Sequence, residues 1–199
     1  MIGRSRVKTA SIAYRNIPVG VMARMLLLVG VVCFSIMGRS EAQEGANAAA
    51  LAQLRGLAGE WEGPFVWTGA RTDTGTMHAS YYATGNGSAV VENLSASGVL
   101  AMTSVYHLDG VDLRMTHFCG AQNQPRLKAR QIDVAKGILD FDFVDVTNLR
   151  SPDAPHVYGL EMRLLSADHI TLTFLFEGGS KQSRELIDLK RVDHKLSAK

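Results

Sequence analysis

Apolar and polar residues alternate with a period of two over most of the chain, from Trp61 to about residue 192. Alternation with this period is typical of half-buried β-strands, and Gly, Asn and Asp interrupt it about every ten residues. The pattern predicts about ten strands, over residues 61–68, 76–84, 88–95, 99–108, 111–119, 126–133, 138–146, 156–165, 168–177 and 181–192. Because short links join successive strands, we expect an all-β fold, a closed antiparallel up-and-down barrel without exposed edges.

Leucines at helical spacing precede the first strand. Leu51, Leu54 and Leu57 lie three residues apart, and Asn47 is the expected N-cap. The chain then divides into a linker over residues 43–50, a lipocalin-like barrel over residues 51–193 that includes this short helix, and a polar tail over residues 194–199.

The first 42 residues have the character of a leader. A basic start is followed by the apolar run Met25–Met37, whose 13 residues are fewer than the ~20 that a membrane-spanning helix needs. Small residues follow and would allow cleavage before Gln43. This order predicts a signal peptide, and therefore a periplasmic or secreted protein with no membrane attachment once the signal is removed.

Removing the leader changes the charge of the chain. Six of the 21 lysines and arginines but one of the 19 acidic residues lie in residues 1 to 42, which leaves 15 basic and 18 acidic residues. The sequence pI of 8.6 therefore derives from the leader. Without a basic surface to neutralise phosphates, we expect no nucleic-acid partner. Cys119 is the single cysteine after the leader, so no internal disulfide can form.

The segment from Met102 to Cys119 shows most clearly which side chains point inward. Asp109-Gly110 predicts a tight hairpin in which Ser104 faces Met115 and Met102 faces His117. Alternation then places on the apolar, inward face Met102, Ser104, Tyr106, Leu108, Val111, Leu113, Met115, His117 and Cys119. His107 falls on the outer face, beside Asp112.

The predicted interior is rich in methionine and aromatic residues. A barrel of this size is either filled by its side chains or keeps room for one small ligand, and the sequence leaves both open. If a ligand binds, the expected contacts are Trp67, Tyr81, Met102, Ser104, Tyr106, Met115, His117, Cys119, Phe141 and Tyr158, with Asn123, Gln124 and Arg126 at the rim.

His117 carries the sharpest chemical hypotheses. It is either a buried histidine bonded to Tyr106 or Ser104, or a ligand contact such as an axial haem ligand, or an acid–base group. His117 and Cys119 share a face, but no third and fourth metal ligand is recognisable, so we predict no metal site. Ser104 and His117 lack an orienting acid, because Asp109 is in the turn and Asp112 points outward, so we predict no catalytic residues.

Two sets of motifs carry a family resemblance. The stretch Leu54–Gly63, LRGLAGEWEG, resembles the entry of lipocalin-like (calycin) barrels, including nitrobindins, in which the Trp packs across the closed end. The segments 87–94, 102–126 and 170–179 together resemble a family of small exported bacterial lipocalin-like proteins of uncharacterised function. The resemblance covers roughly residues 50–192 and implies a barrel and export, but no reaction. Nitrobindins bind haem through a late histidine, and here the late histidines are His169 and His194, neither of which matches that motif.

These observations predict an exported barrel that holds a small, largely apolar molecule. Haem binding through His117, a filled barrel acting as an interaction protein, and a calycin-type isomerase or lyase are the alternatives.

Overall fold

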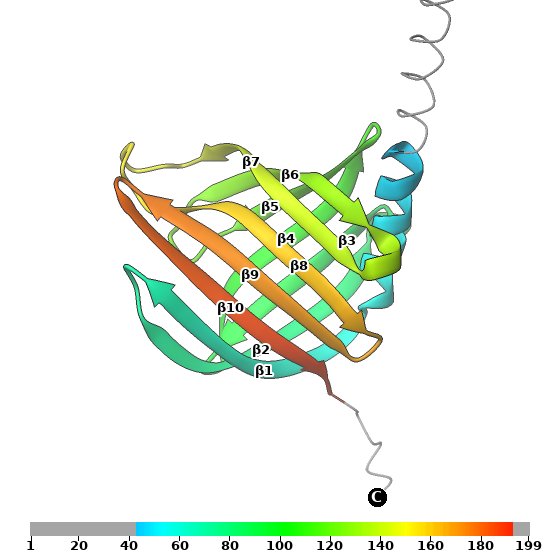
Figure 1. Ribbon diagram of the computed structural model, residues 1–199, viewed down its shortest axis with the longest axis horizontal. Helices are drawn as coiled ribbons and strands as arrows, with labels where there is room; N and C mark the ends of the chain where they lie inside the picture. The colour runs from blue at the N-terminus through cyan, green and yellow to red at the C-terminus, as the bar shows by residue number, and fades with distance from the viewer. Residues whose placement is uncertain (1–42, 193–199) are drawn as a thin grey trace, which may run out of the picture. The chain divides into compact units, whose positions relative to one another are not determined.

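The described part of the computed structural model, residues 43–192, contains ten strands that form one closed antiparallel barrel. Each strand pairs with its neighbours in sequence, and β1 closes the barrel against β10 (Figure 1). The predicted all-β up-and-down barrel is therefore confirmed. The predicted leader and polar tail, with His194, lie outside the described residues.

The ten strands follow the predicted ranges within a few residues. They are β1 Gly59–Gly69, β2 Asp73–Thr84, β3 Ala89–Ala96, β4 Val99–Asp109, β5 Asp112–Phe118, β6 Gln124–Asp133, β7 Ile138–Thr147, β8 His156–Ser166, β9 His169–Gly178 and β10 Lys181–Arg191. Two short 3-10 turns join strands at one end, η1 Gly85–Gly87 and η2 Val134–Lys136.

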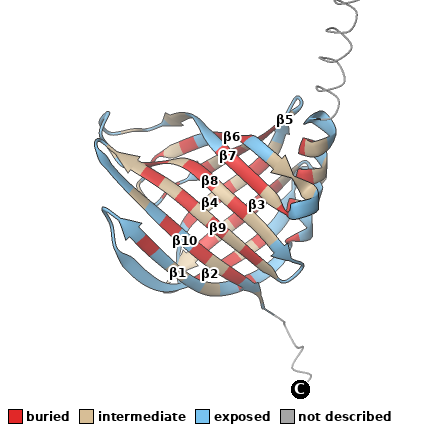
Figure 2. Cartoon of the chain, viewed as in Figure 1, coloured by how far each residue is buried: buried red, intermediate tan, exposed pale blue. Residues whose placement is uncertain are grey.

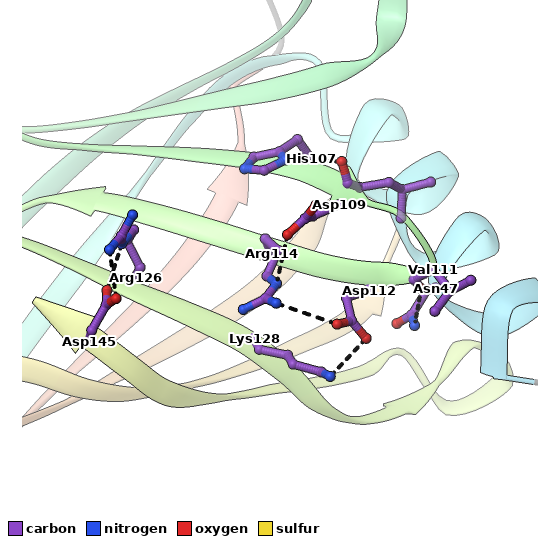
Figure 3. A network of polar contacts seen from close by, with 10 residues as sticks. Asn47, His107, Asp109, Val111, Asp112, Arg114, Arg126, Lys128 and Asp145 are labelled. Atoms are coloured by element: carbon purple, nitrogen blue, oxygen red, sulfur yellow. Dashed lines mark hydrogen bonds and ion pairs between the residues drawn. The ribbon is translucent and has the colours of Figure 1, made fainter. Parts of the chain in front are cut away.

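A helix over residues 43–56 covers one end of the barrel (Figure 1). The predicted linker at residues 43–50 is helical, because its alanines favour helix and Ala50 packs in the core. Asn47 is therefore inside the helix and is not an N-cap. Its buried Nδ2 donates to the carbonyl of Val111 at 2.7 Å, which ties the helix to the β4–β5 turn (Figure 3). No helix within residues 43–192 has the length and apolar character needed to cross a membrane.

Trp61 fills the space beneath the helix. Its indole donates to the carbonyl of Leu57 at 2.8 Å, and the Arg191 guanidinium lies over its ring at 4.3 Å. Gly63, two residues later, faces β10 so closely that a side-chain carbon there would overlap the Asp188 carbonyl oxygen. The Gly-x-Trp-x-Gly sequence thus places a large ring inside the barrel and lets the backbone of β1 pass close to that of β10 at Gly63.

The β4–β5 hairpin differs from its predicted register by two residues. Asp109 pairs with Asp112 and Ser104 pairs with His117, so the loop consists of Gly110 and Val111. Gly110 takes a positive φ of 59°, which suits a tight hairpin turn. Because the period of a strand is two, this shift leaves Ser104, Tyr106, Met115 and His117 facing inward as predicted. Leu108 and Val111 were predicted to face inward but are exposed, because they lie beside and within the turn. His117 is fully buried, as predicted.

Burial alternates along the strands, and exposed residues dominate the hairpins opposite the helix (Figure 2). The outer wall carries ion pairs, including Lys128 to Asp112 at 2.8 Å and Arg126 to Asp145 at 2.6 Å (Figure 3). His107 is partly exposed, and its partner in the β4–β5 register is Arg114. Such exposed pairs contribute little to stability, so the interior must hold the fold together.

Leu54 tests the contribution of the helix to that interior, because its side chain is fully buried. We expect Leu54→Ala to lower the free energy of unfolding by about 2–5 kcal/mol in urea titrations. The exposed neighbour Arg55 provides the control, and Arg55→Ala should change it by less than about 0.5 kcal/mol. Equal losses in the two variants would contradict a packed helix.

Candidate functional site

The barrel end opposite the helix contains a cavity of about 840 Å³. Links between strands surround its mouth: β1–β2, β5–β6, β7–β8 and β9–β10. Its apolar wall includes Trp67, Met102, Cys119 and Phe176, all on inward-facing strand positions or at a strand end. The interior is therefore filled near the helix and open at the other end.

Aromatic and cationic side chains stack at one side of the mouth. The rings of Trp67 and Phe176 lie 4.6 Å apart between centroids. The Arg71 guanidinium lies 4.0 Å above the Trp67 ring and pairs with Asp73 at 3.1 Å. A ligand in this cavity would contact a fixed aromatic surface beside a cation.

A buried polar network occupies the middle of the barrel, centred on Glu92 of β3. Tyr81 and Tyr106 both donate to its Oε2, at 2.6 and 3.1 Å. Ser104 donates to its Oε1 at 2.9 Å, and the Ser104 oxygen lies 3.0 Å from Nδ1 of His117. Three hydroxyl donors thus replace the water that a carboxylate loses on burial.

This network determines which ring nitrogen of His117 carries the proton. Because Ser104 gives its own proton to Glu92, its oxygen accepts from Nδ1–H of His117. The other ring nitrogen, Nε2, is then a bare acceptor. Burial lowers the pKa of His117 to about 3, so the imidazole is neutral. Phe174 packs on the ring, with centroids 4.9 Å apart.

Burial also raises the pKa of the acidic groups in the interior. It raises the pKa of Glu92, against the lowering effect of bonds from Tyr81, Ser104 and Tyr106. Burial raises the pKa of Glu185 on β10 to about 7, against the nearby Arg71 charge and a hydrogen bond from Trp67. The pKa of the Cys119 thiol is likewise raised by burial.

The structure separates the predicted site residues, apart from Tyr158, into four groups. Those on the cavity wall are Trp67, Met102 and Cys119. Those in the buried network are Tyr81, Ser104, Tyr106 and His117. Met115 and Phe141 are core residues. The rim candidates behave as structural residues: Asn123 donates to the Pro155 carbonyl, Gln124 accepts from Thr147, and Arg126 pairs with Asp145 outside the barrel.

Tyr158 lies on the outer side of the wall, where the sequence placed it inside. The β8–β9 pairing shifts by one residue between Val157 and Gly159. This bulge puts Val157 in the core and leaves Tyr158 half-buried beside the outward-facing Glu161 and Arg184. One extra residue reverses the alternation, which a strict period of two does not predict.

Two buried acids, Glu92 and Glu185, were missed in the sequence. Each occupies an inward strand position next to apolar ones. Glu92 lies between Val90 and Leu94, and Glu185 lies between Ser183 and Ile187. An acid at such a position is the signal that identifies them, because carboxylates are almost never buried without a specific environment.

The network holds the His117 proton on Nδ1, and its geometry differs from that of a nucleophilic triad. In a serine–histidine–acid triad the histidine bridges the serine and the acid. Here Ser104 bridges Glu92 and His117, so His117 cannot take the serine proton. Among residues 43–192, no group of three or more His, Cys, Asp and Glu side chains is placed to hold a metal ion. His117 is not among the residues of the cavity wall; it lies one inward position deeper than Cys119 on the same side of the strand.

Comparison with known proteins adds the following. No known family model matches the chain, and no curated protein matches it. A solved structure of a DUF3598-family protein of unknown function from Nostoc punctiforme aligns with a TM-score of 0.49 at 16% identity, over 70% of this chain and 49% of that chain. Rv2717c from M. tuberculosis aligns with a TM-score of 0.48 at 13% identity, over 72% of this chain and 98% of that chain.

The alignment therefore spans about half the length of the DUF3598 protein. What the fold and the cavity define is a closed ten-stranded barrel with an interior that could accept a ligand. Membership of the exported lipocalin-like family stays a prediction.

Glu185 should make stability depend on pH in a definite direction. Its pKa rises from 4.5 to about 7 on folding, so the native state keeps a proton that the unfolded state releases. Its contribution is therefore full below pH 4.5 and is lost as the pH rises to about 7, a change of about 3 kcal/mol. The charged or titratable groups facing it are Arg71, Asp73 and Cys119.

Glu185→Gln isolates this contribution. Urea titrations across this pH range should show wild type losing stability relative to the variant as the pH rises. The opposite effect of His117, whose lowered pKa removes stability as the pH falls from 6.5 to about 3, is present in both proteins and cancels. Parallel stability curves would show that Glu185 does not titrate in this window.

Proposed function

We propose that this protein binds a small, largely apolar molecule in the cavity at the open end of its barrel. The observation that carries the proposal is the cavity itself, about 840 Å³ with Trp67, Met102 and Phe176 in its wall. Ligand sites of proteins typically enclose about 300–1,000 Å³ and combine apolar walls with a few polar groups.

The distribution of polar groups supports this ligand class. The inner wall is mostly apolar, whereas Arg71 and Asp153 lie in the links around the mouth and Lys181 begins β10 there. An apolar body would displace water from the aromatic wall, which is favourable in proportion to the area covered. Polar groups of the ligand would remain near the mouth or form hydrogen bonds with polar residues deeper in the barrel.

The same proposal includes export. It rests on the basic start and the apolar run Met25–Met37, which lie outside the described residues. Immunodetection of a C-terminally tagged protein in cell fractions, with and without residues 1–42, tests it. Retention of the full chain inside the cytoplasm would contradict it.

Blocking the cavity should abolish binding. Ala121 is on the cavity wall, whereas Ala83 is exposed on β2 outside that wall. We expect the purified protein to bind the apolar dye N-phenylnaphthylamine with a rise in its fluorescence. Ala121→Trp should weaken this binding by at least about tenfold, because the new ring occupies ligand volume.

Ala83→Trp is the matched control, since it adds the same ring outside the cavity. It should leave the dye affinity unchanged. Absence of dye binding by wild type, or equal binding by both variants, would overturn the proposed function.

A further inference from the structure

The layer of side chains directly beneath the cavity contains three polar residues, Ser104, His117 and Glu185. On β10, Ser183 is on the cavity wall and Glu185 is the next inward residue. On β4 and β5, Met102 and Cys119 are on the wall, and Ser104 and His117 are the next inward residues. We call Ser104, His117, Phe174 and Glu185 the cavity floor.

Phe174 connects the two titratable residues of the floor. Its ring packs against the imidazole of His117 at 4.9 Å, and its backbone pairs with Glu185 in the β9–β10 ladder. Glu185 in turn pairs with Trp67 of the cavity wall and interacts electrostatically with Cys119. The imidazole and the carboxyl group therefore belong to one contiguous layer next to the cavity.

Each of these two residues has one buried polar atom without a partner. Within residues 43–192, Nε2 of His117 and Oε2 of Glu185 make no hydrogen bond, although both residues are at least 98% buried, with exposures of 0% and 2%. Buried polar atoms are nearly always paired, because an unpaired one lowers stability. Two such atoms in one layer beneath a cavity therefore point to a ligand group that pairs with them.

The chemistry of the two atoms defines that group. Nε2 of His117 is an acceptor, because the proton of the ring is on Nδ1 next to Ser104. Oε2 of Glu185 is an acceptor when the carboxyl group is ionised. A matching ligand must supply hydrogen-bond donors, and an anionic group would be repelled by Glu185.

We propose that the ligand enters with a hydrogen-bond-donor end foremost, and that His117 Nε2 and Glu185 Oε2 accept from this end. The ligand class is an apolar body whose buried end carries an amine or primary amide, which can donate to both atoms, or a hydroxyl, which can donate to one of them. This inference rests on the proposed binding in the cavity and adds its orientation and specificity. An anionic substituent would instead remain at the mouth, beside Arg71 and Lys181.

The experiment compares two probes that differ by one donor. Para-butylphenol carries a hydroxyl donor, and para-butylanisole replaces its hydrogen by a methyl group. Calorimetric titration of the full-length protein, in mildly alkaline buffer that keeps Glu185 ionised, measures both affinities. We expect wild type to prefer the phenol by at least about tenfold, the effect of a hydrogen bond to a charged or buried acceptor.

Three variants assign the preference to the floor. Glu185→Met and His117→Phe remove the acceptors with similar shape. Because the phenol has a single proton to donate, we expect the variant that lacks the acceptor it uses to lose the preference. Asp140→Asn removes a buried carboxylate that pairs with Arg163 and Arg130, away from the cavity, and should leave the preference intact.

The outcomes separate the two proposals. If the dye and both probes fail to bind to wild type, the proposed function is wrong and the inference with it. If the probes bind equally well to wild type, the cavity binds apolar molecules and the donor-acceptor floor is wrong. A preference for the phenol that survives in both Glu185→Met and His117→Phe would also overturn the inference.

Discussion

In a closed barrel, every second side chain of ten strands must share one interior from which water is excluded. In this protein that constraint sets both the packing and the chemistry. The half beneath the helix is filled by large groups such as Trp61, Tyr106 and Phe141, which supply apolar burial. The other half is not filled and contains the cavity. The closed ring of strands leaves the end of the barrel as the way into it.

Polar residues in such an interior need partners from the barrel itself. Glu92 obtains them from hydroxyl groups on β2 and β4, so its carboxylate links three neighbouring strands. Removing one donor would leave part of this charge unpaired, which is far less favourable than removing the whole network. The satisfied network of Glu92 and the unpaired atoms of the cavity floor are adjacent. The network organises the fold, and the unpaired atoms are the acceptors that we propose for a ligand.

The sequence predicted the ten strands because alternation and turn residues are both local signals. It also predicted that His117 points inward. The β4–β5 register differs from the predicted one by two residues, and a shift by an even number leaves His117 on the same face. The direction of Tyr158 required knowledge of the bulge at Val157 and Gly159, which arises only when β8 pairs with β9. The cavity floor was half predicted. His117 was identified and Glu185 was not, because only the closed barrel brings β5 and β10 into one layer next to the cavity.

The position of Glu185 reflects a balance between the stability of the barrel and the recognition of a ligand. A barrel selected for stability alone would replace Glu185 by an apolar residue such as its β10 neighbours Ile187 and Leu189, which are fully buried. Instead, the acid lies in the one layer where the filled interior ends and the cavity begins. In the proposed mode of binding, a bound donor group would restore this loss of stability by mass action. A position that is unfavourable in the empty barrel and favourable in the occupied one is what a specificity-determining residue requires.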